Sequence, residues 1–186
     1  FAPDLVMAVD DEANAFLQKF FGANYPFKIF YASVNETHSR YGYDQARNVA
    51  GIIGILPLTG IKEALSVIEA KPSLRLAAVG VKNQTDQAML EQIQQFDWQP
   101  HTLHSFGLFQ TSQEWQDYVM KISGEVDAIL ILGYSGLFDP DRSSDLPDQE
   151  IVAWVETNSR ALPIGLHGQY VRDGGGIAFA IDERED

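Results

Sequence analysis

Polar and aromatic side chains that could bind a small molecule recur directly after apolar, strand-like runs of the chain. The carboxyl ends of parallel strands meet at one edge of a sheet, and ligands of open α/β sheets bind at that edge. For any one of these residues, capping a helix or turning a loop is the simpler explanation. Taken as a set, they predict a binding cleft lined by Asp10, Asp11, Asn35, Asn83, Tyr134, Ser135, His167 and Gln169.

The segment GYSG at Gly133–Gly136 resembles the nucleophile elbow of hydrolases but lacks part of that motif. The motif requires Gly two positions after the serine, and Leu137 stands there. His167 follows a later strand-like run and could serve as a base, although a lone polar residue at a strand end is more often a pocket residue. We therefore predict no catalytic residues and no enzymatic activity.

The loop Asp139–Glu150 carries acidic or hydroxyl side chains at positions 1, 3, 5, 7 and 12 of a calcium-loop frame. The frame requires Gly at its sixth position, where Ser144 stands, and prolines occupy its second and ninth positions. We expect a solvated loop that leads into a helix N-terminus and holds no calcium.

Two further patterns fail as metal or cofactor sites. His101 and His104 are three residues apart on an expected strand, so they point to opposite faces of it. The triplet Gly174–Gly176 lacks the glycine spacing of a dinucleotide-binding turn. The sequence therefore predicts neither a metal nor a cofactor.

The segment Leu5–Phe21 also resembles the opening of a response-regulator receiver domain, in which an acidic pair after the first strand holds magnesium. Asp10 and Asp11 would be that pair. A receiver further needs a phospho-accepting Asp at the end of its third strand, and the corresponding run Gly51–Gly60 contains no carboxylate. A receiver-like signalling domain stays as the alternative interpretation.

Apolar runs of strand length alternate with windows of helical periodicity, which predicts an α/β fold with a mostly parallel sheet. The helical windows are 58–68, 89–96, 115–122 and 151–155, with a capping box at Thr111 and Glu114 and an acidic first turn after Pro147. The stretch Ala32–Asn48 has neither period, so we expect a cleft-lining loop or a linker. The expected strands are Asp4–Val9, Phe27–Tyr31, Val49–Leu56, Leu74–Val79, His101–Phe106, Val126–Leu132, Leu162–Leu166 and Gly176–Ile181.

Composition excludes several classes of protein. The chain has 186 residues, of which 45% are hydrophobic, enough for a packed core. A net charge of −13 with only 13 Lys and Arg residues argues against nucleic-acid binding. There is no cysteine, so no disulfide or thiol chemistry is possible and an oxidising compartment is tolerated. The longest apolar runs, Ile52–Leu56 and Ala128–Leu132, are far shorter than the roughly 18 residues that span a bilayer, so we expect no membrane insertion.

Several segments, in this order and spacing, resemble the periplasmic-binding-like family of ABC transporter substrate-binding proteins. The likeness is greatest to the branch found as sensory domains of bacterial signalling proteins. The matching segments are PDLVMAVDDEANAFL (Pro3–Leu17), FKIFYASVN (Phe27–Asn35), NVAGI (Asn48–Ile52), LRLAAVGVKNQTD (Leu74–Asp86), VDAILILGYSG (Val126–Gly136) and LPIGLHGQYVRDGGGIAFAID (Leu162–Asp182).

This resemblance implies a type I fold of two α/β lobes, with parallel sheets flanked by helices, that closes on a small ligand. Residues 1–56 would form the C-terminal part of the first lobe with the crossover, and residues 57–186 the second lobe. The first lobe would be incomplete, lacking its first strands and the helix that returns to it.

The resemblance also implies where the cleft lies and what it does. Asp10, Asp11 and Asn35 would face the cleft from the first lobe, and Asn83, Tyr134 and His167 from the second. We expect Tyr134 to supply a stacking face and Asp11, Asn83 and His167 to supply hydrogen bonds. Some members bind amino acids, including aromatic ones. The implied partner is a membrane permease for uptake or a fused signalling module for sensing, in the periplasm or at the cell surface.

Overall fold

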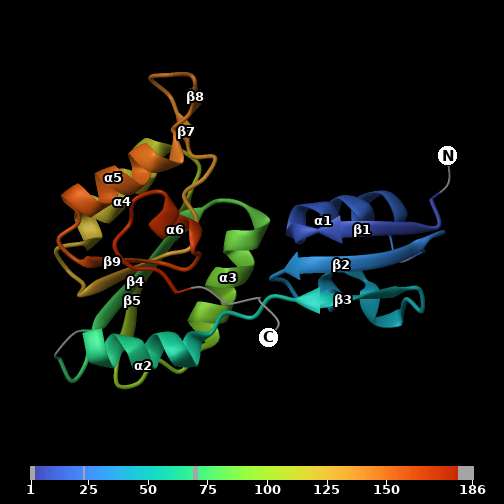
Figure 1. Ribbon diagram of the computed structural model, residues 1–186, viewed down its shortest axis with the longest axis horizontal. Helices are drawn as coiled ribbons and strands as arrows, with labels where there is room; N and C mark the ends of the chain where they lie inside the picture. The colour runs from blue at the N-terminus through green and yellow to red at the C-terminus, as the bar shows by residue number, and fades with distance from the viewer. Residues whose placement is uncertain (1–2, 23, 69–70, 180–186) are drawn as a thin grey trace.

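The computed structural model describes residues 3–22, 24–68 and 71–179. They form two parallel β-sheets, each packed against its own helices and joined by residues 54–57 (Figure 1). We call the part with the three-stranded sheet the first lobe and the part with the four-stranded sheet the second lobe.

The first lobe has strand order β1-β2-β3 with all neighbours parallel. Its helix α1 and two short 3-10 helices cover one face of this sheet, where Leu17, Ile29 and Tyr31 pack together. In chain order its elements are β1 (Leu5–Val9), α1 (Asp10–Phe21), β2 (Lys28–Val34), η1 (His38–Tyr41), η2 (Tyr43–Gln45) and β3 (Val49–Ile53).

The opposite face of the three-stranded sheet is apolar and exposed. Met7 is 65% exposed and Ile52 is 64% exposed, and Met7 aligns with Phe30 and Ala50 across the three strands. Parallel sheets usually have both faces covered. The described part of the chain leaves this face open to solvent.

The second lobe has strand order β5-β4-β6-β9, again with all neighbours parallel, and a small antiparallel hairpin. Its elements are α2 (Leu58–Ile68), β4 (Arg75–Val81), α3 (Gln84–Gln95), β5 (Thr102–Phe109), α4 (Ser112–Ile122), β6 (Ala128–Ile131), the hairpin strands β7 (Phe138–Asp139) and β8 (Ser144–Asp145), α5 (Asp148–Asn158), β9 (Leu162–Gly165) and α6 (Gln169–Arg172).

Strand β4 shows why the runs of the second lobe are continuously apolar. Successive side chains of a strand point to opposite faces. Leu76 and Ala78 pack into the cluster formed by α2 and α3, whereas Ala77 and Val79 pack into the cluster formed by α4 and α5. Both faces of β4 are therefore buried. If apolar and polar residues alternated along this strand, one face would bury polar side chains.

Most predicted elements are confirmed in position. The capping box is present: Glu114 N donates to Thr111 Oγ1 at 3.3 Å, and Thr111 N donates to Glu114 Oε2 at 3.4 Å. Helix α5 begins at Asp148, directly after Pro147, with an acidic first turn.

Two expectations turn out differently. The predicted strand Gly176–Ile181 is represented only by an isolated bridge between Ala178 and Gly165, and residues 180 and 181 lie outside the described part. The stretch Ala32–Asn48, expected to be a loop or linker, contributes the buried rings of Tyr41 and Tyr43 to the first-lobe core. Its 3-10 helices are too short to show a helical period in sequence.

Candidate ligand-binding cleft

Two adjoining cavities lie between the lobes. The first, of about 370 Å³, is lined from the first lobe and the crossing segment by Ser33, Asn35 and residues 54–57, and from the second lobe by residues 166–169 and Arg172. We call it the crossover compartment. The second, of about 310 Å³, is lined by Asp10, Val81, Asn83, Thr85, Asp86, residues 132–135, His167 and Gln169. We call it the helix compartment, because α1 and α3 begin beside it. His167 and Gln169 line both, so the two compartments form one cleft.

The ends of strands from both sheets position the residues that line this cleft. Asp10 directly follows β1, Asn83 lies two residues after β4, and His167 lies two residues after β9. Since all three strands end at the cleft, their carboxyl ends meet there, as expected for ligand sites of open α/β sheets.

The backbone is strained at two lining positions. Asp10 has φ 76° and Ser33 has φ 54°, in the left-handed region that residues other than glycine rarely adopt. Such residues tend to cluster at functional sites, where the surrounding structure holds them in place. Both lie at the cleft, one in each compartment.

Seven of the eight predicted site residues line the cleft, and Asp11 lies behind it. The lining residues are Asp10, Asn35, Asn83, Tyr134, Ser135, His167 and Gln169. The Asp11 side chain is fully buried between the lobes.

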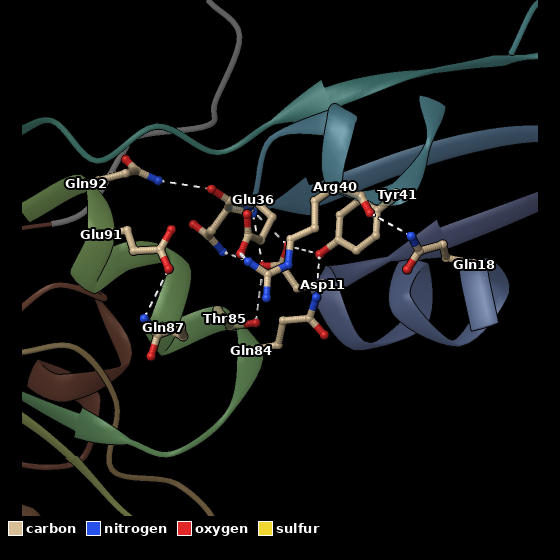
Figure 2. A network of polar contacts seen from close by, with 11 residues as sticks. Asp11, Gln18, Glu36, Arg40, Tyr41, Gln84, Thr85, Gln87, Glu91 and Gln92 are labelled. Atoms are coloured by element: carbon tan, nitrogen blue, oxygen red, sulfur yellow. Dashed lines mark hydrogen bonds and ion pairs between the residues drawn. The ribbon is translucent and has the colours of Figure 1, made fainter. Parts of the chain in front are cut away.

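Asp11 is surrounded by hydrogen-bond donors of the protein itself (Figure 2). Its Oδ1 accepts from Glu36 N at 3.1 Å and from Tyr41 Oη at 2.7 Å, and its Oδ2 accepts from Asn35 N at 3.0 Å. A buried carboxylate is stable only when paired in this way. Asp11 thus holds the segment after β2, and with it Asn35, against the start of α1.

Helix α3 of the second lobe makes the polar contacts to the first lobe. Thr85 Oγ1 donates to Asp10 Oδ1 at 2.8 Å, and Gln84 Nε2 donates to Tyr41 Oη at 3.1 Å. Gln92 Nε2 donates to Asn35 O at 3.1 Å (Figure 2), while Gln92 Oε1 accepts from Leu56 N. The relative position of the two lobes therefore depends on one helix face.

Several lining side chains already have partners. Tyr134 is only 6% exposed; its ring packs edge-on against Tyr170 and its hydroxyl donates to Asp173 Oδ2 at 2.8 Å. Asn83 caps α3 by accepting from Asp86 N at 2.7 Å. Ser135 Oγ donates to the carboxylate of Asp148 at 2.7 Å rather than to an imidazole.

His167 lies at the junction of the compartments, where it lines both. The protein atoms around the ring exclude enough water to lower the pKa of its imidazole, and Asp10 offsets only part of this effect. The neutral ring is therefore favoured at neutral pH, with one nitrogen that donates and one that accepts.

Four lining residues with polar or charged side chains were not predicted from the sequence: Ser33, Thr85, Asp86 and Arg172. Asp86 is 4% exposed, and burial raises the pKa of its carboxyl group to about 6, although the Val81 amide and the Asn83 side chain lower it in part. Acidic and hydroxyl residues in a first helical turn are ordinary in sequence, so only the fold shows that these face a cavity.

The loop with the calcium-like frame pairs its acids internally. Arg142 Nε lies 3.3 Å from Asp139 Oδ2, and Arg142 Nη2 lies 2.7 Å from Glu150 Oε2. Within the described ranges, no group of three or more His, Asp or Glu side chains could hold a metal ion.

No helix in the described ranges is long and apolar enough to cross a membrane.

Comparisons with known proteins show the fold. No protein-family model and no curated protein sequence matches this chain. A conserved domain protein from Vibrio cholerae O1 biovar El Tor is similar in structure, with TM-score 0.68 and 16% identity over 97% of this chain and 58% of that chain. An ABC domain from Streptococcus pneumoniae, in complex with L-Trp, has TM-score 0.68 and 17% identity over 96% of this chain and 60% of that chain.

This chain therefore has a periplasmic-binding-like fold, which confirms the predicted α/β class with parallel sheets flanked by helices. It spans about three fifths of the length of either neighbour.

Proposed function

We propose that this protein binds a small molecule in the cleft between its lobes and catalyses no reaction on it. The observation that carries the proposal is the cleft itself: two connected cavities at strand ends, walled by both lobes, with polar side chains from each. A ligand that contacts both lobes favours the closed arrangement by its additional contacts there. The structural neighbour that holds L-Trp supports a ligand of about amino-acid size.

We further propose an extracytoplasmic setting, with ligand capture for ABC-type uptake or for sensing by a fused signalling module. The name of the Streptococcus neighbour supports the ABC assignment, and the absence of cysteine suits an oxidising compartment. The full-length gene product separates the two roles, because a transmembrane segment followed by signalling elements indicates sensing.

Binding is tested by screening amino acids and other small metabolites by thermal shift, followed by calorimetric titration of each hit. His167→Ala and Arg172→Ala should weaken binding by roughly five- to 150-fold, the effect of about 1–3 kcal/mol for a lost hydrogen bond. Neither side chain has a hydrogen-bond or ion-pair partner among the described residues, so the fold should survive both changes. Arg160→Ala, an exposed arginine outside both compartments, is the matched control. Unchanged affinity in both cleft variants would show that the ligand binds elsewhere.

A further inference from the structure

The hydroxyl groups of the helix compartment all donate to carboxylates. Thr85 Oγ1 donates to Asp10, Tyr134 Oη donates to Asp173, and Ser135 Oγ donates to Asp148, at 2.8, 2.8 and 2.7 Å. A hydroxyl has one proton to donate. These three groups can therefore offer a ligand only their lone pairs, and the compartment is rich in acceptors.

The charges of the helix compartment have the same sign. Asp10 and Asp86 both line it, and among the described residues no Lys or Arg does. The N-termini of α1 and α3 each contribute about half a positive charge, which offsets about one of the two carboxylates. A negative charge of about one remains, and the neutral form of His167 does not cancel it.

The crossover compartment differs in chemistry. Its wall includes apolar Ile55, Leu56 and Leu166, and it contains the guanidinium-bearing Arg172. The Arg172 guanidinium has no ion-pair or hydrogen-bond partner among the described residues, so it is available to a ligand. The cleft thus offers apolar surface and a cation on one side and acceptors with negative charge on the other.

We propose that the helix compartment binds a primary ammonium group of the ligand, with Asp10 and Asp86 as the charged acceptors and Thr85 and Ser135 as neutral ones. An ammonium has three protons to donate and no lone pair, which matches acceptors that cannot donate. Charge-assisted hydrogen bonds of this kind are about twice as strong as neutral ones. This inference rests on the proposed binding function and names the chemical group that the cleft selects.

The test compares compounds that share an aromatic ring and differ in the polar groups on its side chain, by calorimetric titration at pH 7.5. One set is tryptamine, L-tryptophan, indole-3-propionate and indole-3-ethanol; the other is phenethylamine, L-phenylalanine, 3-phenylpropionate and 2-phenylethanol. We expect the amine-bearing members of at least one set to bind at least tenfold more tightly than the matched carboxylate and alcohol. Asp10→Asn and Asp86→Asn should each reduce this preference at least tenfold.

Asp117→Asn, which removes the same charge from the exposed side of α4, should leave the preference unchanged. Circular dichroism and thermal melting of each variant establish that it is folded. Three results would overturn the inference: tighter or equal binding of a carboxylate or alcohol, a preference that survives both cleft variants, or no binding of any amine. If carboxylates or alcohols bind and depend on His167, the proposed binding function stands without it. If no compound of any class binds the cleft, the proposed function itself fails.

Discussion

The carboxyl group of Asp86 lies directly against the backbone of Gly133, in the wall of the cleft. A Cβ added to Gly133 would be 2.7 Å from Asp86 Oδ1 and 2.9 Å from its Cγ, and one added to Gly80 would be 2.6 Å from Oδ2. Gly80 in β4 and Gly133, two residues after β6, thus leave the space that this one side chain, from the first turn of α3, occupies. Asp86 is enclosed as a result, and this burial raises the pKa of its carboxyl group to about 6.

Replacing Asp86 by Asn should stabilise the protein at neutral pH. The folded state binds the Asp86 proton more tightly than the unfolded state does, so the carboxyl group reduces stability as pH rises from about 4 to above 6. A rise of the Asp86 pKa from its ordinary value near 4 to about 6 corresponds to about 3 kcal/mol at most. Asn also retains an oxygen to accept from Val81 N.

The check is urea unfolding of the wild type and the Asp86→Asn variant at pH 4 and pH 7.5. The variant should gain stability at pH 7.5 and little at pH 4. The difference between the two proteins isolates Asp86 from acids such as Glu114 and Asp127, whose lowered pKa values produce the opposite pH trend. A gain of equal size at both pH values would contradict the raised pKa.

Gly133→Ala should displace the Asp86 carboxyl group. The new methyl group overlaps atoms of Asp86, and overpacking of this kind typically costs about 1–3 kcal/mol. Gly124→Ala is the matched control, because a Cβ at Gly124 meets nothing within 4 Å. Thermal melting should separate the two variants clearly. If Gly133→Ala melts at the wild-type temperature and binds as the wild type does, the carboxyl group does not lie where the structure places it.

The sequence predicts the order of strands and helices, because this order depends on the spacing of apolar residues. It also predicts the edge of the sheets at which the cleft lies, because that edge follows from where the strands end. Both faces of β4 are buried, so its residues read as one apolar run, and Asn83 after it falls at the cleft. Asp10 and Asp11 look equivalent in sequence. Successive helical residues differ by about 100° in direction, so one lines the cleft and the other is buried behind it.

Asp86 could not be predicted, because its environment comes from one glycine in β4 and another just after β6. Gly80 and Gly133 leave the space that Asp86 fills, and neither is close to it in a motif that marks a site. The sequence also does not show to which acceptor each hydroxyl group donates its proton. Ser135 donates to a carboxylate 13 residues away, on a helix that follows a separate hairpin.

Tyr41→Phe should loosen the contact between the lobes. The buried Tyr41 hydroxyl donates to Asp11 Oδ1 and accepts from Gln84 Nε2, so it connects the first lobe to α3. Its removal leaves both partners short of a hydrogen bond and should cost about 1–3 kcal/mol. Limited proteolysis should then cut faster at residues 54–57, between the lobes. Tyr118→Phe loses a hydroxyl that bonds to Ser105 within the second lobe, so it should leave that cleavage rate unchanged.

A lysine should affect stability very differently on the two faces of β1. Met7 is 65% exposed and Ala8 is 2% exposed, because adjacent strand residues point to opposite faces. Met7→Lys should change the free energy of unfolding by no more than about 0.5 kcal/mol, as surface substitutions usually do. It should also reduce any self-association of the chain, since it places a charge in the row formed with Phe30 and Ala50.

Ala8→Lys should unfold the first lobe, because the lysine would be buried unpaired against α1. Urea unfolding and analytical ultracentrifugation of the two variants test this together. A severe loss of stability in Met7→Lys would show that this face is covered in solution.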